Sequence, residues 1–118
     1  MTAQWLIDKL ELAPLPGEGG FYRETYRSEE CMQRGTAHKN ASTAIYFLLT
    51  AETKSALHRL PTDEVFHFYL GDTVEMVQID KTGKLKRVRL GSSLVNDEKV
   101  QVLVPAGVWQ GSALVPGG

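Results

Sequence analysis

The stretch Ser55-Ala56-Leu57-His58-Arg59-Leu60-Pro61-Thr62-Asp63-Glu64-Val65-Phe66-His67-Phe68-Tyr69-Leu70-Gly71 decides the fold. Two short runs of alternating polarity flank a turn at Pro61 to Asp63, as β-strands do. Alternate residues of a strand share a face, so His58 and Leu60 point one way, and Glu64 and Phe66 share a face of the second run. A hairpin with these faces aligned would bring His58 and Glu64 to one pocket. An imidazole beside a carboxylate suits a divalent metal or acid–base chemistry.

Further strands are predicted on both sides of this stretch. Each run is short, bounded by turn residues, and rich in β-branched or aromatic residues. The expected strands are 21–27, 43–50, 55–59, 64–70, 73–80, 85–90, 100–104 and 109–115. Many short strands with regular turns predict an antiparallel sandwich or barrel.

Three local features complete this prediction. Thr2 is a candidate N-cap for a helix through Ala3, Leu6, Ile7 and Leu10, which Pro14 and Pro16 would stop. The residues 80–84 predict a hairpin turn in which Gly83 supplies a positive φ. Residues 28–41 are polar without an apolar period, so a solvated loop is expected there.

Length and composition exclude several classes of protein. The chain has 118 residues, of which 42% are hydrophobic and 23% charged, which is typical of one folded domain over residues 1–118. A net charge of -1 argues against nucleic acid as a partner. The single cysteine, Cys31, excludes an internal disulfide framework, and no apolar run approaches the roughly 20 residues that span a bilayer. Without a signal peptide at the start, a cytoplasmic location is expected.

The central stretch resembles the cupin superfamily, whose motifs read G-x5-H-x-H-x3,4-E-x6-G and G-x5-P-x-G-x2-H-x3-N. His58, Glu64 and Gly71 match the first motif, with Leu60 where its second histidine would stand. The segment 105–110 is similar to the second motif, with Gln110 at the position of the third histidine. Two of the four usual metal ligands are therefore changed.

A closer resemblance is to a small cupin family catalogued as a domain of unknown function. The shared segments are Gly19 to Ser28, Ser42 to Leu49, His58 to Leu60, Asp63 to Gly71 and Val104 to Gln110. The resemblance implies an all-β antiparallel double-stranded β-helix, the cupin jelly roll, with one N-terminal helix. Relatives usually continue past Val115 with strands that close the barrel, so we expect those strands to be missing here.

The resemblance also implies a pocket inside the barrel. The candidate catalytic residues are His58 and Glu64, and the candidate ligand-binding residues are Arg23, Phe66 and Gln110. Phe66 has a simpler interpretation as a core residue, and Arg23 as an exposed strand arginine. His58, Glu64 and Gln110 are also candidate metal ligands, but a glutamine is a poor transition-metal ligand. The expected cofactor is therefore none, or a weakly held divalent metal.

Three hypotheses for function remain. The first is an isomerase or epimerase acting on a sugar or nucleotide-sugar, with His58 as base, Glu64 orienting or exchanging protons and Arg23 holding an anionic group. The second is a non-catalytic module that binds a nucleotide or another small molecule at a degenerate metal site. The third is a structural cupin with a vestigial pocket. The resemblance implies a homodimer, and no membrane partner is expected.

Overall fold

The computed structural model describes residues 1–115, apart from the side chains of Arg34 and Ala37. The expectation that barrel-closing strands are missing after Val115 concerns residues 116–118, which lie outside the described residues. The chain divides into two compact units, which we call the N-terminal unit (residues 1–15 and 20–48) and the C-terminal unit (residues 16–19 and 49 onward). Among the described residues, no helix is long and apolar enough to cross a membrane.

The N-terminal unit begins with the predicted helix, α1 (Ala3–Leu10). Thr2 caps it, because its hydroxyl accepts a hydrogen bond of 3.0 Å from the Trp5 amide. The helix ends at Glu11, which adopts a left-handed conformation. Three antiparallel strands follow in the order β1-β2-β5, which are β1 (Ala13–Pro14), β2 (Phe21–Arg27) and β5 (Thr43–Leu48). The helix and the two longer strands were thus predicted correctly, with β5 ending two residues earlier than expected.

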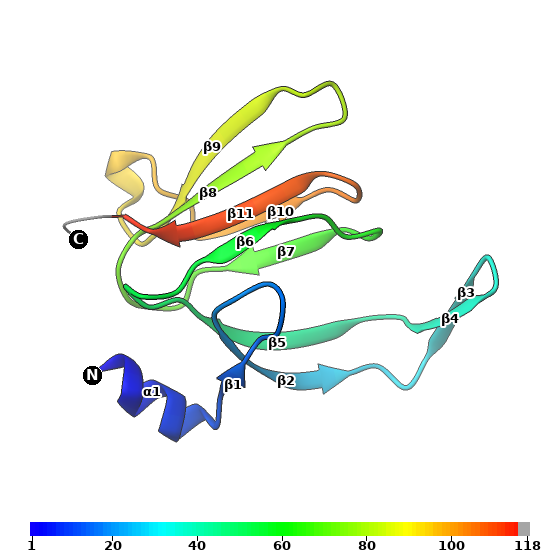
Figure 1. Cartoon of the computed structure of the whole chain (residues 1–118), viewed down its shortest axis with the longest axis horizontal. Helices are drawn as coiled ribbons and strands as arrows, with labels where there is room; N and C mark the ends of the chain where they lie inside the picture. Colours follow the sequence, from blue (N-terminus) through cyan, green and yellow to red (C-terminus); the bar gives the residue numbers. More distant parts are fainter. Residues whose placement is uncertain (116–118) are drawn as a thin grey trace. The chain divides into compact units, whose positions relative to one another are not determined.

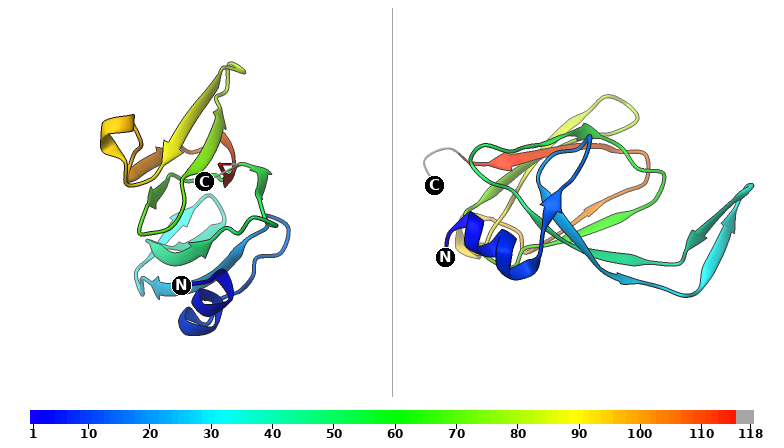
Figure 2. Two further views of the ribbon diagram at one scale, coloured as in Figure 1. Left: turned by 90° about the vertical axis from the view of Figure 1, so that its left-hand side faces the viewer. Right: turned by 60° about the horizontal axis from the view of Figure 1, so that its bottom comes forward.

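The predicted loop at residues 28–41 is wrong, because this segment contains a β-hairpin. Strands β3 (Cys31–Arg34) and β4 (Ala37–Asn40) pair antiparallel, and Gly35 takes φ +60° in the turn. Figure 2 shows this hairpin extending away from β2 and β5. Met32, Gln33, His38 and Lys39 are all exposed, so no side chain that the structure describes in this hairpin is buried. The sequence here has no apolar alternation, which is the signal that predicts strands.

The C-terminal unit contains two antiparallel sheets (Figure 1). The larger has the order β6-β11-β8-β9 and the smaller pairs β7 with β10. Their bounds are β6 (Ser55–His58), β7 (Glu64–His67), β8 (Val74–Ile79), β9 (Leu85–Leu90), β10 (Gln101–Val104) and β11 (Trp109–Leu114), with a 3-10 helix, η1 (Leu94–Asn96), between β9 and β10. The hairpin suggested for the central stretch is wrong, since β6 pairs with β11 and β7 with β10. Every strand expected in this unit is present, although several end earlier than predicted.

The core of this unit lies between the inner faces of its two sheets. Its buried members are Met76, Leu90, Val102 and Val104, and Phe66, Phe68, Val74, Val88 and Val108 pack against them. Alternation along each strand explains the set, because Met76 and Val74 are two residues apart on β8, as Val102 and Val104 are on β10. The unit therefore has an apolar interior that both sheets contribute.

Two carboxylates stabilise the connections between strands in the C-terminal unit. Asp80 Oδ1 accepts hydrogen bonds from the Thr82 hydroxyl and the backbone amides of Thr82 and Lys84, and these lower the pKa of Asp80. With Gly83 at φ +84°, this confirms the predicted turn between β8 and β9. Glu98 accepts from the Thr73 hydroxyl at 2.7 Å and the Ser93 amide at 3.0 Å, which lowers its pKa as well. The long connection from β9 to β10 is thereby tied to the start of β8.

Candidate functional site

A row of four polar residues crosses the inner face of the larger sheet. His58 on β6 is paired with Gln110 on β11, Gln110 with Gln78 on β8, and Gln78 with Lys86 on β9. Directly paired residues of antiparallel strands project from the same face of a sheet. That face is the interior one, because Met76 stands two residues from Gln78 and is only 1% exposed. We call His58, Gln110, Gln78 and Lys86 the polar row.

The smaller sheet supplies a carboxylate to this row. Gln110 Nε2 donates a hydrogen bond of 2.6 Å to Oε1 of Glu64 on β7. Gln110 is only 2% exposed, and a buried amide needs a hydrogen-bond partner within the protein. Glu64 is that partner. Gln110 thus lies beside His58 on one sheet and contacts Glu64 of the other. Although the suggested hairpin is wrong, the structure still brings these three predicted residues to one part of the interior.

Both ring nitrogens of His58 lie close to oxygen atoms of the protein. Its Nδ1 lies 2.6 Å from the carbonyl oxygen of Ala56. A carbonyl oxygen can only accept, so Nδ1 carries a proton and donates it to this bond. Its Nε2 lies 3.6 Å from Oε2 of Glu18, and the His58 side chain is 18% exposed. Nε2 is therefore outside hydrogen-bond range of Glu18, and the two groups form an ion pair only when the imidazole carries a second proton.

Glu18 is the site residue that the sequence reasoning missed. Its backbone carbonyl accepts a hydrogen bond of 2.6 Å from the Ala56 amide, which ties its loop to the start of β6. The glycines on either side, Gly17 and Gly19, take φ values of +80° and +93°. Its signal in the sequence was a single charged residue within Pro16-Gly17-Glu18-Gly19-Gly20. A glycine run allows one backbone segment to approach another closely, which could have placed Glu18 beside a strand.

Two predicted ligand-binding residues have other contacts. Arg23 lies on β2 in the N-terminal unit, where its guanidinium is 3.5 Å from the Glu11 carboxylate and stacks over the Tyr46 ring at 5.6 Å. The Arg23 Nε atom is buried and has no hydrogen-bond partner within the described part of the chain. Phe66 packs against the buried core cluster. Their roles in binding a ligand stay predictions.

The donor set offered by this geometry does not fit a transition metal. Both nitrogens of His58 face other protein groups, and one oxygen of Glu64 accepts the Gln110 amide. Within residues 1–115, no three His, Cys, Asp or Glu side chains are grouped where they could hold a metal ion. Bound zinc normally has three or four protein ligands. The assignment of His58, Glu64 and Gln110 as metal ligands stays a prediction, and we derive no chemistry from it.

Comparison with known proteins identifies the family. Residues 4–118 match the family described as "Cupin superfamily (DUF985)". The chain belongs to this cupin family. The all-β antiparallel architecture with one N-terminal helix is accordingly the cupin jelly roll predicted from the sequence.

The chain is also similar to two solved structures and one curated protein. A hypothetical protein from Leishmania major has a TM-score of 0.92 and 34% identity, and the match covers 100% of this chain and 73% of that one. A crystal structure from Shewanella oneidensis has a TM-score of 0.88 and 38% identity, covering 97% of this chain and 70% of that one. An uncharacterized protein of Saccharomyces cerevisiae is 29% identical over 110 residues, which are 84% of this chain and 55% of the relative. The cupin chain therefore spans about half the length of the curated relative that it matches.

The names of these relatives describe no activity. Two are called hypothetical or uncharacterized, and the third name gives only a source. The family is itself catalogued without a function. The function of this cupin must therefore be argued from its own site.

Proposed function

We propose that this chain binds a sugar or nucleotide-sugar beside His58 and Gln110, at one end of the polar row, and that His58 transfers a proton on the bound molecule in an isomerase or epimerase reaction. The observation that carries the proposal is the placement of His58. Its Nδ1 is fixed on the Ala56 carbonyl and its Nε2 stands 3.6 Å from the Glu18 carboxylate. A carboxylate next to a fixed imidazole stabilises the imidazolium that forms when the histidine takes a proton.

The proton movement follows from this arrangement. Nε2 takes the proton from a carbon beside the carbonyl of the sugar, and the electron pair of the broken C–H bond passes to the carbonyl oxygen as an enolate. The proton on Nε2 exchanges with solvent and then adds to the former carbonyl carbon, while the hydroxyl proton of the neighbouring carbon passes to the former carbonyl oxygen, which gives an isomer. Alternatively, a solvent proton adds to the same carbon on its other face and Nε2 releases its proton to solvent, which gives an epimer. Transfer requires Nε2 within about 2.6–3.2 Å of the reacting group. The Glu18 side chain, 3.6 Å from Nε2, stabilises the imidazolium while it exists.

Glu64 and Gln110 serve as positioning residues in this proposal. One oxygen of Glu64 accepts the Gln110 amide, which leaves its second oxygen to accept a bond from a sugar hydroxyl. A sugar offers several hydroxyl donors, so this pair favours a polyhydroxylated ligand over an apolar one.

We expect nucleotide-sugars or sugar phosphates to raise the melting temperature of the protein. A ligand at about five times its Kd should raise it by about 5 °C for a domain of this size. His58→Gln should remove most of this rise, because it removes the imidazole and its pairing with Glu18. His67→Gln is the matched control, since His67 is exposed and contacts only the Gln101 amide and the Tyr69 ring among the contacts described. An equal rise in the His58 variant, or no rise with any of these compounds, would contradict the proposal.

The second candidate is a binding module without catalysis. The bond from Gln110 to Glu64 favours it, because a carboxylate engaged in this way is less free to act as a second proton donor. Binding with no exchange of carbon-bound protons would support this candidate. The homodimer and the cytoplasmic location stay predictions.

A further inference from the structure

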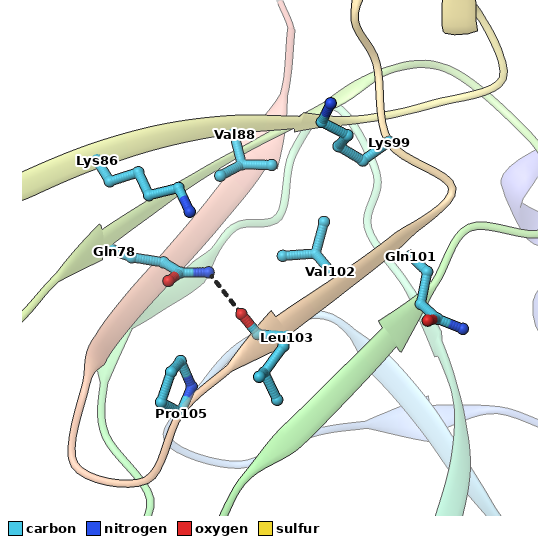
Figure 3. Close-up of a pocket in the computed structure, with 8 residues that line it drawn as sticks. All are labelled: Gln78, Lys86, Val88, Lys99, Gln101, Val102, Leu103 and Pro105. Carbon is cyan, nitrogen blue, oxygen red and sulfur yellow. Dashed lines mark hydrogen bonds between the residues drawn. The ribbon is translucent and has the colours of Figure 1, made fainter.

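A concave surface lies at the other end of the polar row from His58. A groove of about 360 Å³ runs between β9 and β10 and is lined by Gln78, Lys86, Val88, Lys99, Gln101, Val102, Leu103 and Pro105 (Figure 3). Gln78 closes its floor, because it is only 7% exposed and its Nε2 donates to the Leu103 carbonyl at 3.2 Å. Three strand spacings separate His58 from Lys86 along the row, which places their Cα atoms about 14 Å apart. The groove is therefore a separate place from the proposed proton-transfer site.

The charge along this groove is positive. Among the described residues, Lys86 and Lys99 are the charged side chains that line it, and Figure 3 shows them flanking Val88. Lys86 has no ion-pair partner within the described part of the chain. Lys99 pairs at 3.0 Å with Asp97, which is 91% exposed and stands outside the lining.

An adjoining hollow extends the positive surface. It measures about 380 Å³, shares Gln78, Lys86 and Pro105 with the groove, and adds Lys84 and Asp80. The Asp80 carboxylate is engaged by three hydrogen bonds within its own turn. Across both surfaces three lysines face one acidic side chain, although the whole chain has a net charge of -1. The excess of cations is thus local to the groove.

The walls of the groove are apolar. Val102 is 7% exposed and belongs to the core cluster, and Val88 packs against that cluster. Leu103, which is 51% exposed, and Pro105 form the opposite wall. A strongly solvated anion alone would leave these walls without a partner, whereas an anion with a small apolar body would cover them.

We propose that this groove is a binding site for a small phosphate monoester with an apolar body, whose phosphate is held by Lys86 and Lys99. Lysine ammonium groups bind phosphate as mobile point charges, and the walls formed by Val88, Val102 and Pro105 take the apolar part. The groove volume of about 360 Å³ sets the size of this body, which must be small. This site does not depend on the proposed activity of His58.

Phenyl phosphate tests the proposal by NMR titration of the full chain. We expect saturable chemical-shift changes at the side-chain amide of Gln78 and the methyl groups of Val88 and Val102. Benzyl alcohol, which has a similar body without the charge, should give no saturable change, and inorganic phosphate should bind more weakly than phenyl phosphate.

Charge substitutions identify the residues that hold the phosphate. Lys86→Glu should weaken phenyl phosphate binding at least tenfold, and Lys86→Gln should weaken it by a smaller factor. Lys39→Glu, an exposed lysine on the β3–β4 hairpin, is the matched control and should leave binding unchanged. His58→Gln should also bind phenyl phosphate normally, which separates this site from the proposed function. Unchanged affinity in the folded Lys86→Glu variant, shift changes centred on His58 and Gln110, or no saturation at millimolar phenyl phosphate would overturn the proposal.

Discussion

Replacing Gly19 with alanine should lower the free energy of unfolding by about 3 kcal/mol, one of the two largest effects expected in this chain. Gly19 has φ +93°, a conformation that alanine rarely adopts. An added Cβ would also collide with the backbone carbonyl oxygen of Lys54, which cannot move as a flexible side chain can. The loop that carries Glu18 would have to shift away from β6, so the ion pair with His58 should be lost as well.

Gly17 provides the matched control for this prediction. It has φ +80° in the same loop, but an added Cβ would meet no heavy atom within 4 Å. Gly17→Ala should therefore cost only about 1 kcal/mol, the conformational penalty alone. Chemical denaturation of the two variants measures both values. Equal losses would show that the close approach of Gly19 to Lys54 is wrong, and with it the placement of Glu18.

Gln110→Glu is the second substitution with a large expected effect. It replaces the amide that donates to Glu64 with a carboxylate, at a position that is 2% exposed. Two carboxylates would then face each other away from solvent, and we expect a loss of about 3 kcal/mol in the free energy of unfolding at pH 7. Denaturant unfolding at constant pH and salt measures the loss.

The exchanged pair tests whether this loss comes from the contact with Glu64. Glu64→Gln combined with Gln110→Glu restores one amide donor and one carboxylate acceptor, so the double variant should recover at least half of the stability lost in Gln110→Glu. Residues in contact give a coupling energy in such a cycle, whereas distant residues give additive effects. An additive double variant would show that Gln110 and Glu64 do not meet, and the proposed positioning of the site would fail.

The sequence was sufficient for the elements whose signal is local. Thr2 and the apolar spacing of α1 predicted the helix, and alternating polarity predicted β2 from Phe21 to Arg27 without error. Gly83 and Asp80 likewise predicted their turn. In each case the cap, the period or the required φ lies within a few residues of chain.

Other features depend on tertiary contacts that no short stretch encodes. No described side chain of the β3–β4 hairpin is buried, and its sequence lacks the apolar period that would have predicted the strands. Strands β6 and β7 are consecutive and separated only by residues 59–63, yet they pair with β11 and β10, because the chain passes from one sheet to the other within this short segment. Glu18 reaches His58 through the contact of its loop with Ala56, which lies 38 residues away in sequence (56 − 18). His58, Glu64 and Gln110 were therefore predictable as site residues from the sequence, whereas Glu18, the partner of His58, was not.

Exchange of carbon-bound protons with solvent tests whether His58 transfers a proton on a bound sugar. The protein is incubated in deuterium oxide with the nucleotide-sugars and sugar phosphates that raise its melting temperature, and deuterium in each compound is measured by mass spectrometry and NMR. We predict deuterium at a carbon beside the carbonyl with the unmodified chain and with His67→Gln, and a rate at least about a hundredfold lower with His58→Gln. Equal exchange with His58→Gln, or no exchange in any compound that binds, would contradict the claim.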